Sequence, residues 1–255
     1  MPPKQRPNRV PSPGQSRRPS RSVLLALVAA AVIVAVGAIA LSLTVGRGKK
    51  TPTNASTGSA PTIAASSLGV VDGIPQHGLV LGSPKAKVTL TEYIDTSCPV
   101  CKDYALTTFP SIVKTYVRPG KVKIESRVVA FVDPPRSKLG RQLLLAAARQ
   151  NKAWQLSEVL YQNQGQEGTA WLTDSYARKL AAKVPDLDVE KLFTDAASAS
   201  VQDEATTTDS QAQADGVRAT PTFLLTTRDG VRHMLGAGNP GFPAFAKVLD
   251  RALKE

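Results

Sequence analysis

The sequence has few soft metal ligands, with only two cysteines and two histidines in 255 residues. Cys98 and Cys101 are three positions apart, whereas His77 and His233 are distant from them and from each other in sequence. A structural zinc site needs four ligands, commonly at short and regular spacings, so this scarcity argues against zinc. An inert structural disulfide is also disfavoured, because so small a loop removes little chain entropy.

Acidic residues are absent from the first 50 residues, which carry nine of the net twelve positive charges. The rest of the chain has 23 basic and 20 acidic side chains, which is close to balance. The high net charge therefore belongs to the N-terminal part of the chain, and it does not predict nucleic-acid binding.

The N-terminal part divides into two segments of opposite character. Residues 1–22 combine six prolines with six basic residues, so we expect a disordered cytoplasmic tail. Residues 23–45 are uncharged and almost wholly apolar, and a helix of that length crosses a hydrocarbon core of about 30 Å. The basic flank predicts a single-pass anchor with its N-terminus in the cytoplasm and the rest of the chain, after Gly46, outside the cell membrane. A signal peptide cleaved near Ala38–Ala40 is the alternative, and it would export the domain as well.

Residues 46–68 are rich in Thr, Ser, Ala, Gly and Pro, which predicts a flexible linker. We expect one folded domain over residues 69–255. Export places this domain where a disulfide can persist. The linker is too short to form a dimerisation domain, so we expect a monomer.

The two cysteines lie within Thr96–Lys102, after an apolar, β-branched run and before residues with helical spacing. A C-x-x-C at a strand-to-helix junction is typical of a thiol–disulfide redox site. The helix N-terminus would stabilise a thiolate on Cys98, and a thiolate is the attacking species in disulfide exchange. Pro99 suits the first helical position because it has no N–H to satisfy. We therefore predict that Cys98 and Cys101 are redox-active, with Cys101 resolving mixed disulfides when the site acts as a reductant.

Glu92 lies on a predicted strand over residues 87–95, on the same face as Val88, Leu90 and Ile94. Burial there would raise its pKa and let it accept or deliver a proton during exchange. A glutamate that reaches solvent from an edge strand is the alternative, since charged side chains are seldom fully buried.

The predicted order of elements is β-α-β, a helical block, and then β-β-α. Pro110 should kink or split the first helix, and a second strand is predicted over residues 122–131. Strands over 222–227 and 231–235 form a predicted hairpin before a final amphipathic helix. This order describes one sheet with helices on both faces. Helical spacing within the block marks four helices, at residues 139–148, 154–161, 176–181 and 192–196.

Three features together resemble the thioredoxin superfamily, and more closely its DsbA-type exported thiol–disulfide oxidoreductases. They are the Cys98–Cys101 pair after a strand, Glu92 behind it, and the segment Gly216–Phe223 before the hairpin. The resemblance covers residues 72–255 and implies a thioredoxin fold with a helical insertion at about 134–215. It implies no cofactor beyond the redox-active disulfide.

The resemblance also implies that Thr220–Pro221 is a cis-proline pair lying against the disulfide. The backbone of Thr220 would then be open to an extended substrate peptide, with Pro99 and Val100 completing the substrate-binding surface. A trans-proline at the start of a strand is the alternative. Val100 stands where oxidising members often have histidine. Because its side chain cannot donate a hydrogen bond, we expect a less acidic Cys98 and a less oxidising disulfide.

The predicted function is therefore an exported thiol–disulfide oxidase acting on secreted or cell-envelope proteins. The resemblance implies a membrane reoxidase of the DsbB or vitamin-K-epoxide-reductase type as a partner. A reductase of the same fold is one alternative. A non-catalytic, membrane-anchored binding module is the other.

Overall fold

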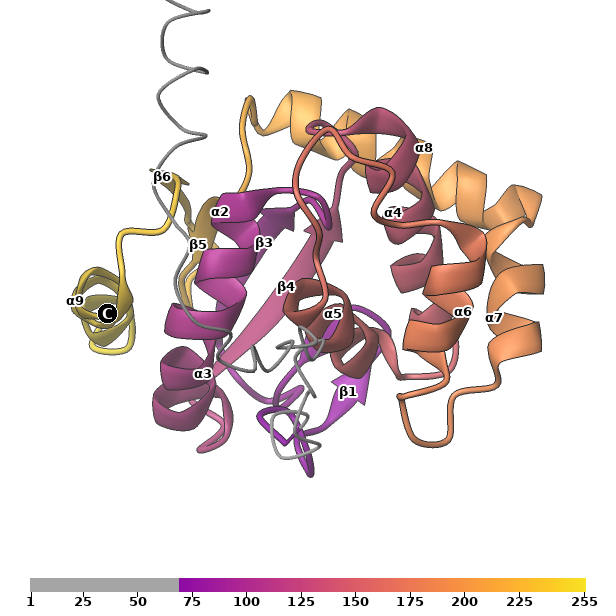
Figure 1. The fold of residues 1–255 in the computed structure, drawn as a ribbon. Helices are drawn as coiled ribbons and strands as arrows, with labels where there is room; N and C mark the ends of the chain where they lie inside the picture. The colour runs from indigo at the N-terminus through magenta and orange to yellow at the C-terminus, as the bar shows by residue number, and fades with distance from the viewer. Residues whose placement is uncertain (1–68) are drawn as a thin grey trace, which may run out of the picture. The chain divides into compact units, whose positions relative to one another are not determined.

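The computed structural model describes residues 69–255, which are coloured in Figure 1. Their sheet has six strands in the order β1-β2-β4-β3-β5-β6. β3 is parallel to β4 and antiparallel to β5, and β5 forms an antiparallel hairpin with β6. The thioredoxin-like sheet is thus confirmed. The strands are β1 Gln76–His77, β2 Val80–Leu81, β3 Val88–Ile94, β4 Val122–Val128, β5 Thr222–Thr226 and β6 Arg232–Ala237.

β3 lies in the middle of the sheet, between β4 and β5. Six of its seven residues are buried, which is expected for a strand with neighbours on both sides. β4 is buried at alternate positions and ends at Val128, three residues earlier than predicted. It ends there because its parallel partner β3 ends at Ile94, and the backbone N–H groups of Phe131 and Val132 donate to the Asp95 carboxylate instead of to a strand.

The helix that follows β3 is continuous but irregular. It consists of α2 (Pro99–Asp103), the π-helical turn η2 (Tyr104–Thr108), α3 (Phe109–Ile112) and the π-helical turn η3 (Val113–Val117). Pro110 is the second residue of α3, two positions after the end of η2. A proline inside a helix removes one i→i−4 bond and crowds the preceding turn, so the interruption at Pro110 has the predicted cause.

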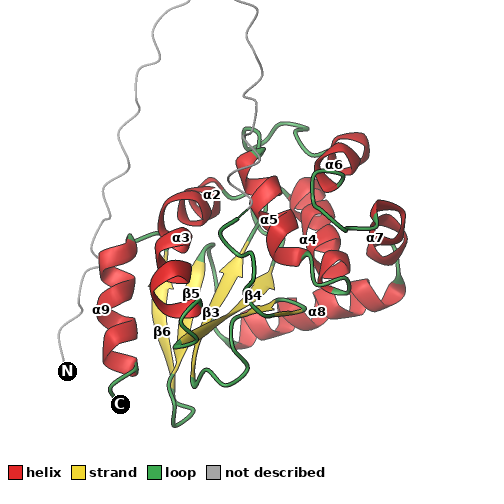
Figure 2. Ribbon diagram, turned by 90° about the horizontal axis from the view of Figure 1, so that it is seen from below, coloured by secondary structure: helices red, strands yellow, loops and turns green. Residues whose placement is uncertain are grey.

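The helical insertion is confirmed and contains five helices, one more than predicted. Figure 2 shows them gathered on one side, with α9 (Phe242–Ala252) on the other. The unpredicted helix is α8, whose buried residues are small or polar and leave only a weak apolar stripe. One sequence signal for α8 was its N-cap residue, because serine is favoured at that position. In the structure the Ser198 side chain accepts a hydrogen bond from the Val201 N–H. The five helices are α4 Pro134–Ala148, α5 Ala153–Gln162, α6 Asp174–Ala181, α7 Val189–Ala196 and α8 Ala199–Ala214.

Three aromatic side chains hold the active-site helix against the sheet. The ring of Tyr104 from η2 lies 4.7 Å from that of Phe223 in β5 and 5.8 Å from that of Phe245 in α9. Phe223 and Phe245 pack edge-on at 4.8 Å. All three are buried, and burying an aromatic side chain contributes about 1.5–3 kcal/mol. This cluster fixes the start of the helix relative to the start of β5.

Within residues 69–255, no helix is both long enough and apolar enough to cross a membrane. The predicted tail (1–22), anchor (23–45) and linker (46–68) lie outside the described residues.

Candidate active site

The two cysteines lie at the beginning of α2, directly after the loop that leaves β3. Cys98 is the N-cap residue and Pro99 the first residue of the helix. Both thiols are free and buried, with exposed fractions of 4% for Cys98 and 0% for Cys101. The backbone N–H of Cys101 donates to Cys98 Sγ at 3.4 Å. In the part of the chain that the structure describes, no group of three or more Cys, His, Asp or Glu side chains could hold a metal.

The two sulfurs have opposite acidities. A hydrogen bond from the Cys101 side chain is the main cause that lowers the pKa of Cys98 to about 6, with smaller contributions from the backbone N–H groups of Cys101 and Val100. Burial raises the pKa of Cys101 well above its usual range. Val100 thus contributes through its backbone although its side chain has no donor. At neutral pH the reduced site therefore holds one thiolate and one thiol.

Thr220 and Pro221 lie directly against Cys98, although they are more than a hundred residues away in sequence. The thiol form of Cys98 donates to the Thr220 carbonyl oxygen at 3.2 Å, and the Thr220–Pro221 peptide bond is cis. Pro99 and Val100 are exposed beside this contact, with 43% of Val100 accessible to solvent. Of the predicted substrate-binding residues, Pro99, Val100 and Thr220 are therefore together at the surface next to the reactive sulfur, whereas Pro221 is buried.

Glu92 points into the interior from the middle of β3. Only 3% of its surface is exposed, so the alternative of a solvent-facing glutamate on an edge strand is wrong. The hydroxyl of Tyr104 donates to Glu92 Oε2 at 3.0 Å. Burial raises the pKa of Glu92 to about 7, with the Tyr104 hydrogen bond opposing that rise. The carboxyl can therefore exist in either protonation state near neutral pH.

Asp95 organises the active-site loop, and sequence reasoning missed it. Its Oδ2 accepts the N–H groups of Phe131 at 2.7 Å and Val132 at 2.9 Å. Its Oδ1 accepts the N–H of Ser97 at 2.8 Å and the hydroxyl of Ser137 at 2.7 Å. Its own N–H points at Cys101 Sγ, 3.5 Å away. Asp95 was an acid directly after a buried strand, but three of its four donors, on Phe131, Val132 and Ser137, are distant in sequence.

Gln164 is a second residue that the sequence did not reveal. It follows α5 in the helical insertion and is buried. Its amide Nε2 donates to the carbonyl oxygens of Thr96 at 2.7 Å and Cys98 at 3.1 Å. The backbone carbonyl oxygen of Gln164 accepts a hydrogen bond from Lys102 Nζ at 3.1 Å. The insertion is thereby attached to the loop that carries the reactive cysteine.

Replacing Gln164 with alanine should destabilise the protein by about 1–3 kcal/mol, because the buried Thr96 carbonyl loses its partner. We also expect Cys98 to react with iodoacetamide at an altered rate, since its loop is less constrained. Urea unfolding and alkylation kinetics measure the two effects. Gln166→Ala, at an exposed position two residues away, is the matched control and should change neither. Equal stability of the two variants would contradict the positioning role.

A dithiol with one acidic and one buried, protonated sulfur is suited to disulfide exchange, because the acidic sulfur both attacks and leaves readily. Together with the fold, it defines a thiol–disulfide oxidoreductase of the DsbA type.

Comparison with known proteins agrees with this class. A family model described as thioredoxin matches residues 75–231, and the chain belongs to that family. The probable disulfide bond formation protein D of Bacillus cereus is 26% identical over 178 residues, which cover 69% of this chain and 78% of that protein. The disulfide bond formation protein D of Bacillus subtilis is 26% identical over 152 residues, which cover 57% of this chain and 66% of that protein.

Solved structures show the same fold. Oxidised BdbD from Bacillus subtilis has a TM-score of 0.60 at 21% identity, covering 71% of this chain and 98% of that one. The α-DsbA1 protein of Wolbachia pipientis has a TM-score of 0.59 at 20% identity, and the match covers 74% of this chain and 96% of that one.

Proposed function

We propose that the protein is an exported thiol–disulfide oxidase that donates its Cys98–Cys101 disulfide to cysteines of secreted or cell-envelope proteins. The observation that carries this proposal is the acidity of Cys98, whose pKa is about 6. A thiolate that is stable at neutral pH lowers the free energy of the reduced form, and this makes the disulfide more oxidising. The relatives named as disulfide bond formation proteins support the same direction.

The reaction begins when a substrate thiolate attacks Cys98 Sγ. The disulfide bond breaks, its electron pair goes to Cys101 Sγ, and that sulfur takes a proton because its pKa is far above neutrality. A second substrate thiolate then attacks the substrate sulfur of the mixed disulfide, and Cys98 leaves as a thiolate. Two substrate thiols are oxidised and one protein disulfide is reduced. Glu92 is the proposed donor of the proton that Cys101 takes.

The substrate peptide lies between Thr220 and the beginning of α2. It pairs with the backbone of Thr220 as an added strand, while the exposed Pro99 and Val100 side chains contact its apolar groups. Backbone pairing is independent of the substrate's side chains, which suits an enzyme that acts on many exported proteins.

Reoxidation requires a partner, because each turnover leaves the cysteines reduced. We propose a membrane reoxidase of the DsbB or vitamin-K-epoxide-reductase type. The apolar segment 23–45 would anchor the protein in the same membrane, with its N-terminus in the cytoplasm and the catalytic domain outside.

The equilibrium with glutathione tests the proposal, because its pH dependence reports the Cys98 thiolate. Two glutathione thiols, each still protonated below about pH 8.5, reduce the disulfide. Above pH 6 the product has Cys98 as a thiolate, so Cys101 keeps one of the two protons and the other is released to solvent. The equilibrium constant for reduction should therefore rise about tenfold per pH unit. The stabilisation of the reduced form is lost as the pH falls through 6, and below that pH the constant should level off.

The same measurement decides the direction of electron flow. We expect a potential at pH 7 nearer to about −120 mV than to −270 mV, since the first is typical of an oxidase and the second of thioredoxin. A constant that is flat between pH 6 and 8 contradicts the acidic Cys98. A potential near −270 mV favours the reductase.

A further inference from the structure

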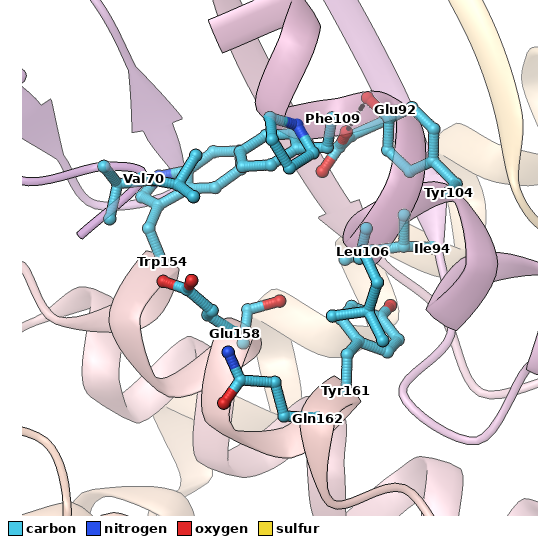
Figure 3. Close-up of a pocket in the computed structure, with 14 residues that line it drawn as sticks. Val70, Glu92, Ile94, Tyr104, Leu106, Phe109, Trp154, Glu158, Tyr161 and Gln162 are labelled. Carbon is cyan, nitrogen blue, oxygen red and sulfur yellow. Dashed lines mark hydrogen bonds between the residues drawn. The ribbon is translucent and has the colours of Figure 1, made fainter. Parts of the chain in front are cut away.

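A cavity of about 160 Å³ lies between β3, the irregular helix η2–α3 and α5. Figure 3 shows the side chains around it. Most of the lining is apolar or aromatic, but two carboxyl groups face the cavity, Glu92 from β3 and Glu158 from α5. The hydroxyl-bearing residues Tyr104, Ser157 and Tyr161 also line it. The cavity therefore joins the buried carboxyl of the active site to a second carboxyl on the helical insertion.

Glu158 is placed for handling protons. Figure 3 shows it across the cavity from Glu92. Its Oε2 is shielded from solvent and has no hydrogen-bond partner among the described residues, although the residue is only partly buried. Burial, and then the nearby charge of Asp72, raise the pKa of Glu158 to about 7. Both carboxyls of the cavity thus change protonation in the same pH range.

The active site needs such a route. Cys101 must gain a proton whenever the disulfide opens, yet its exposed fraction is 0% and that of Glu92 is 3%. Two tyrosines of the cavity lining connect these groups: the Tyr104 hydroxyl donates to Glu92 Oε2, and the Tyr161 hydroxyl donates at 3.3 Å to the carbonyl oxygen of Asp95, whose N–H points at Cys101 Sγ. Burial raises the pKa of both tyrosines well above the usual range, so they remain protonated. Glu92 must therefore be recharged from elsewhere.

We propose that the cavity is the path by which Glu92 exchanges its proton with solvent, and that Glu158 is the outer proton carrier of this path. The proposal rests on the proposed function and adds a residue to it. When the Cys98–Cys101 bond breaks, Cys101 takes the proton of Glu92. Glu92 then takes a proton from Glu158, and Glu158 takes one from solvent. A space of this size holds several water molecules, which the polar groups of the lining can hydrogen bond.

The path has a specific kinetic signature. At pH 6 the Glu92 carboxyl already holds a proton before the disulfide is attacked, so recharging does not limit the reaction. At pH 8 Glu92 is mostly ionised, and a proton must arrive through the cavity during the reaction. Loss of the outer carrier should therefore slow the reaction at pH 8 relative to pH 6. A small diffusible acid that enters the cavity should restore the rate.

The experiment measures single-turnover oxidation of a reduced two-cysteine peptide by the full-length protein at pH 6 and pH 8. In Glu158→Gln we expect the ratio of the pH 8 rate to the pH 6 rate to fall about tenfold, less than the hundredfold or more that a direct general acid contributes. Added imidazole should restore the ratio. Glu167→Gln, which removes an exposed glutamate outside the cavity, is the matched control and should leave the ratio unchanged.

An unchanged ratio in Glu158→Gln overturns the proposal. So does a lower ratio that imidazole does not reverse, because that result indicates a structural role. The proposed function fails separately, if the unmodified protein does not oxidise the peptide at all.

Discussion

Replacing Cys98 with serine should abolish disulfide exchange, reducing peptide oxidation to the rate measured without protein. Cys98 is the sulfur that the substrate reaches, since it lies beside the exposed Pro99 and Val100 and contacts the Thr220 carbonyl. A serine hydroxyl can neither form a disulfide nor ionise near neutral pH, so the variant has no attacking or leaving group. The assay follows oxidative refolding of a reduced protein in a glutathione buffer.

Cys101→Ser is the matched variant, because it removes the other sulfur but leaves Cys98 in place. We expect it to attack a substrate disulfide and then to accumulate as a mixed disulfide that dithiothreitol releases. Gel electrophoresis without reductant would detect the covalent complex, and the same samples would identify the bound substrates. Activity in the Cys98→Ser protein equal to that of the unmodified protein would support the binding-module alternative.

Replacing Asp95 with alanine should cost at least about 3 kcal/mol of unfolding free energy, the largest stability effect that we expect. Its carboxylate accepts four hydrogen bonds, and its exposed fraction is 0%. Each buried donor that loses its acceptor costs about 1–3 kcal/mol, and water replaces only some of these contacts. Urea unfolding at pH 7 measures the change.

Two further variants separate the hydrogen bonds of Asp95 from its volume and charge. Asp95→Asn keeps one acceptor oxygen but turns an NH₂ group toward two donors, so its loss should be intermediate. Asp203→Ala removes an exposed aspartate from α8 and should change stability by less than about 0.5 kcal/mol. An effect of Asp95→Ala as small as that of Asp203→Ala would contradict the organising role of this carboxylate.

The fold was predictable where apolar residues alternate or recur strongly. The central strand, the hairpin and four helices of the insertion follow from such spacing. The exception was α8, which buries Val201 and Ala205 among threonines and other small residues. Its stability depends on packing against the rest of the insertion, and this is invisible in a short window of sequence. The end of β4 was misplaced for a related reason, because its partner β3 ends at Ile94 and the N–H groups of Phe131 and Val132 donate to the Asp95 carboxylate.

The sequence by itself determined the reactive pair, because Cys98, Pro99 and Cys101 lie within one helical turn and local geometry brings the two sulfurs together. Only the tertiary structure decided what surrounds that pair. Gln164 reaches the active-site loop from a helical insertion, and Glu158 faces Glu92 across a cavity. These contacts join segments more than sixty residues apart. Local periodicity specifies which face of an element is buried, but which partner it meets depends on how the whole chain packs.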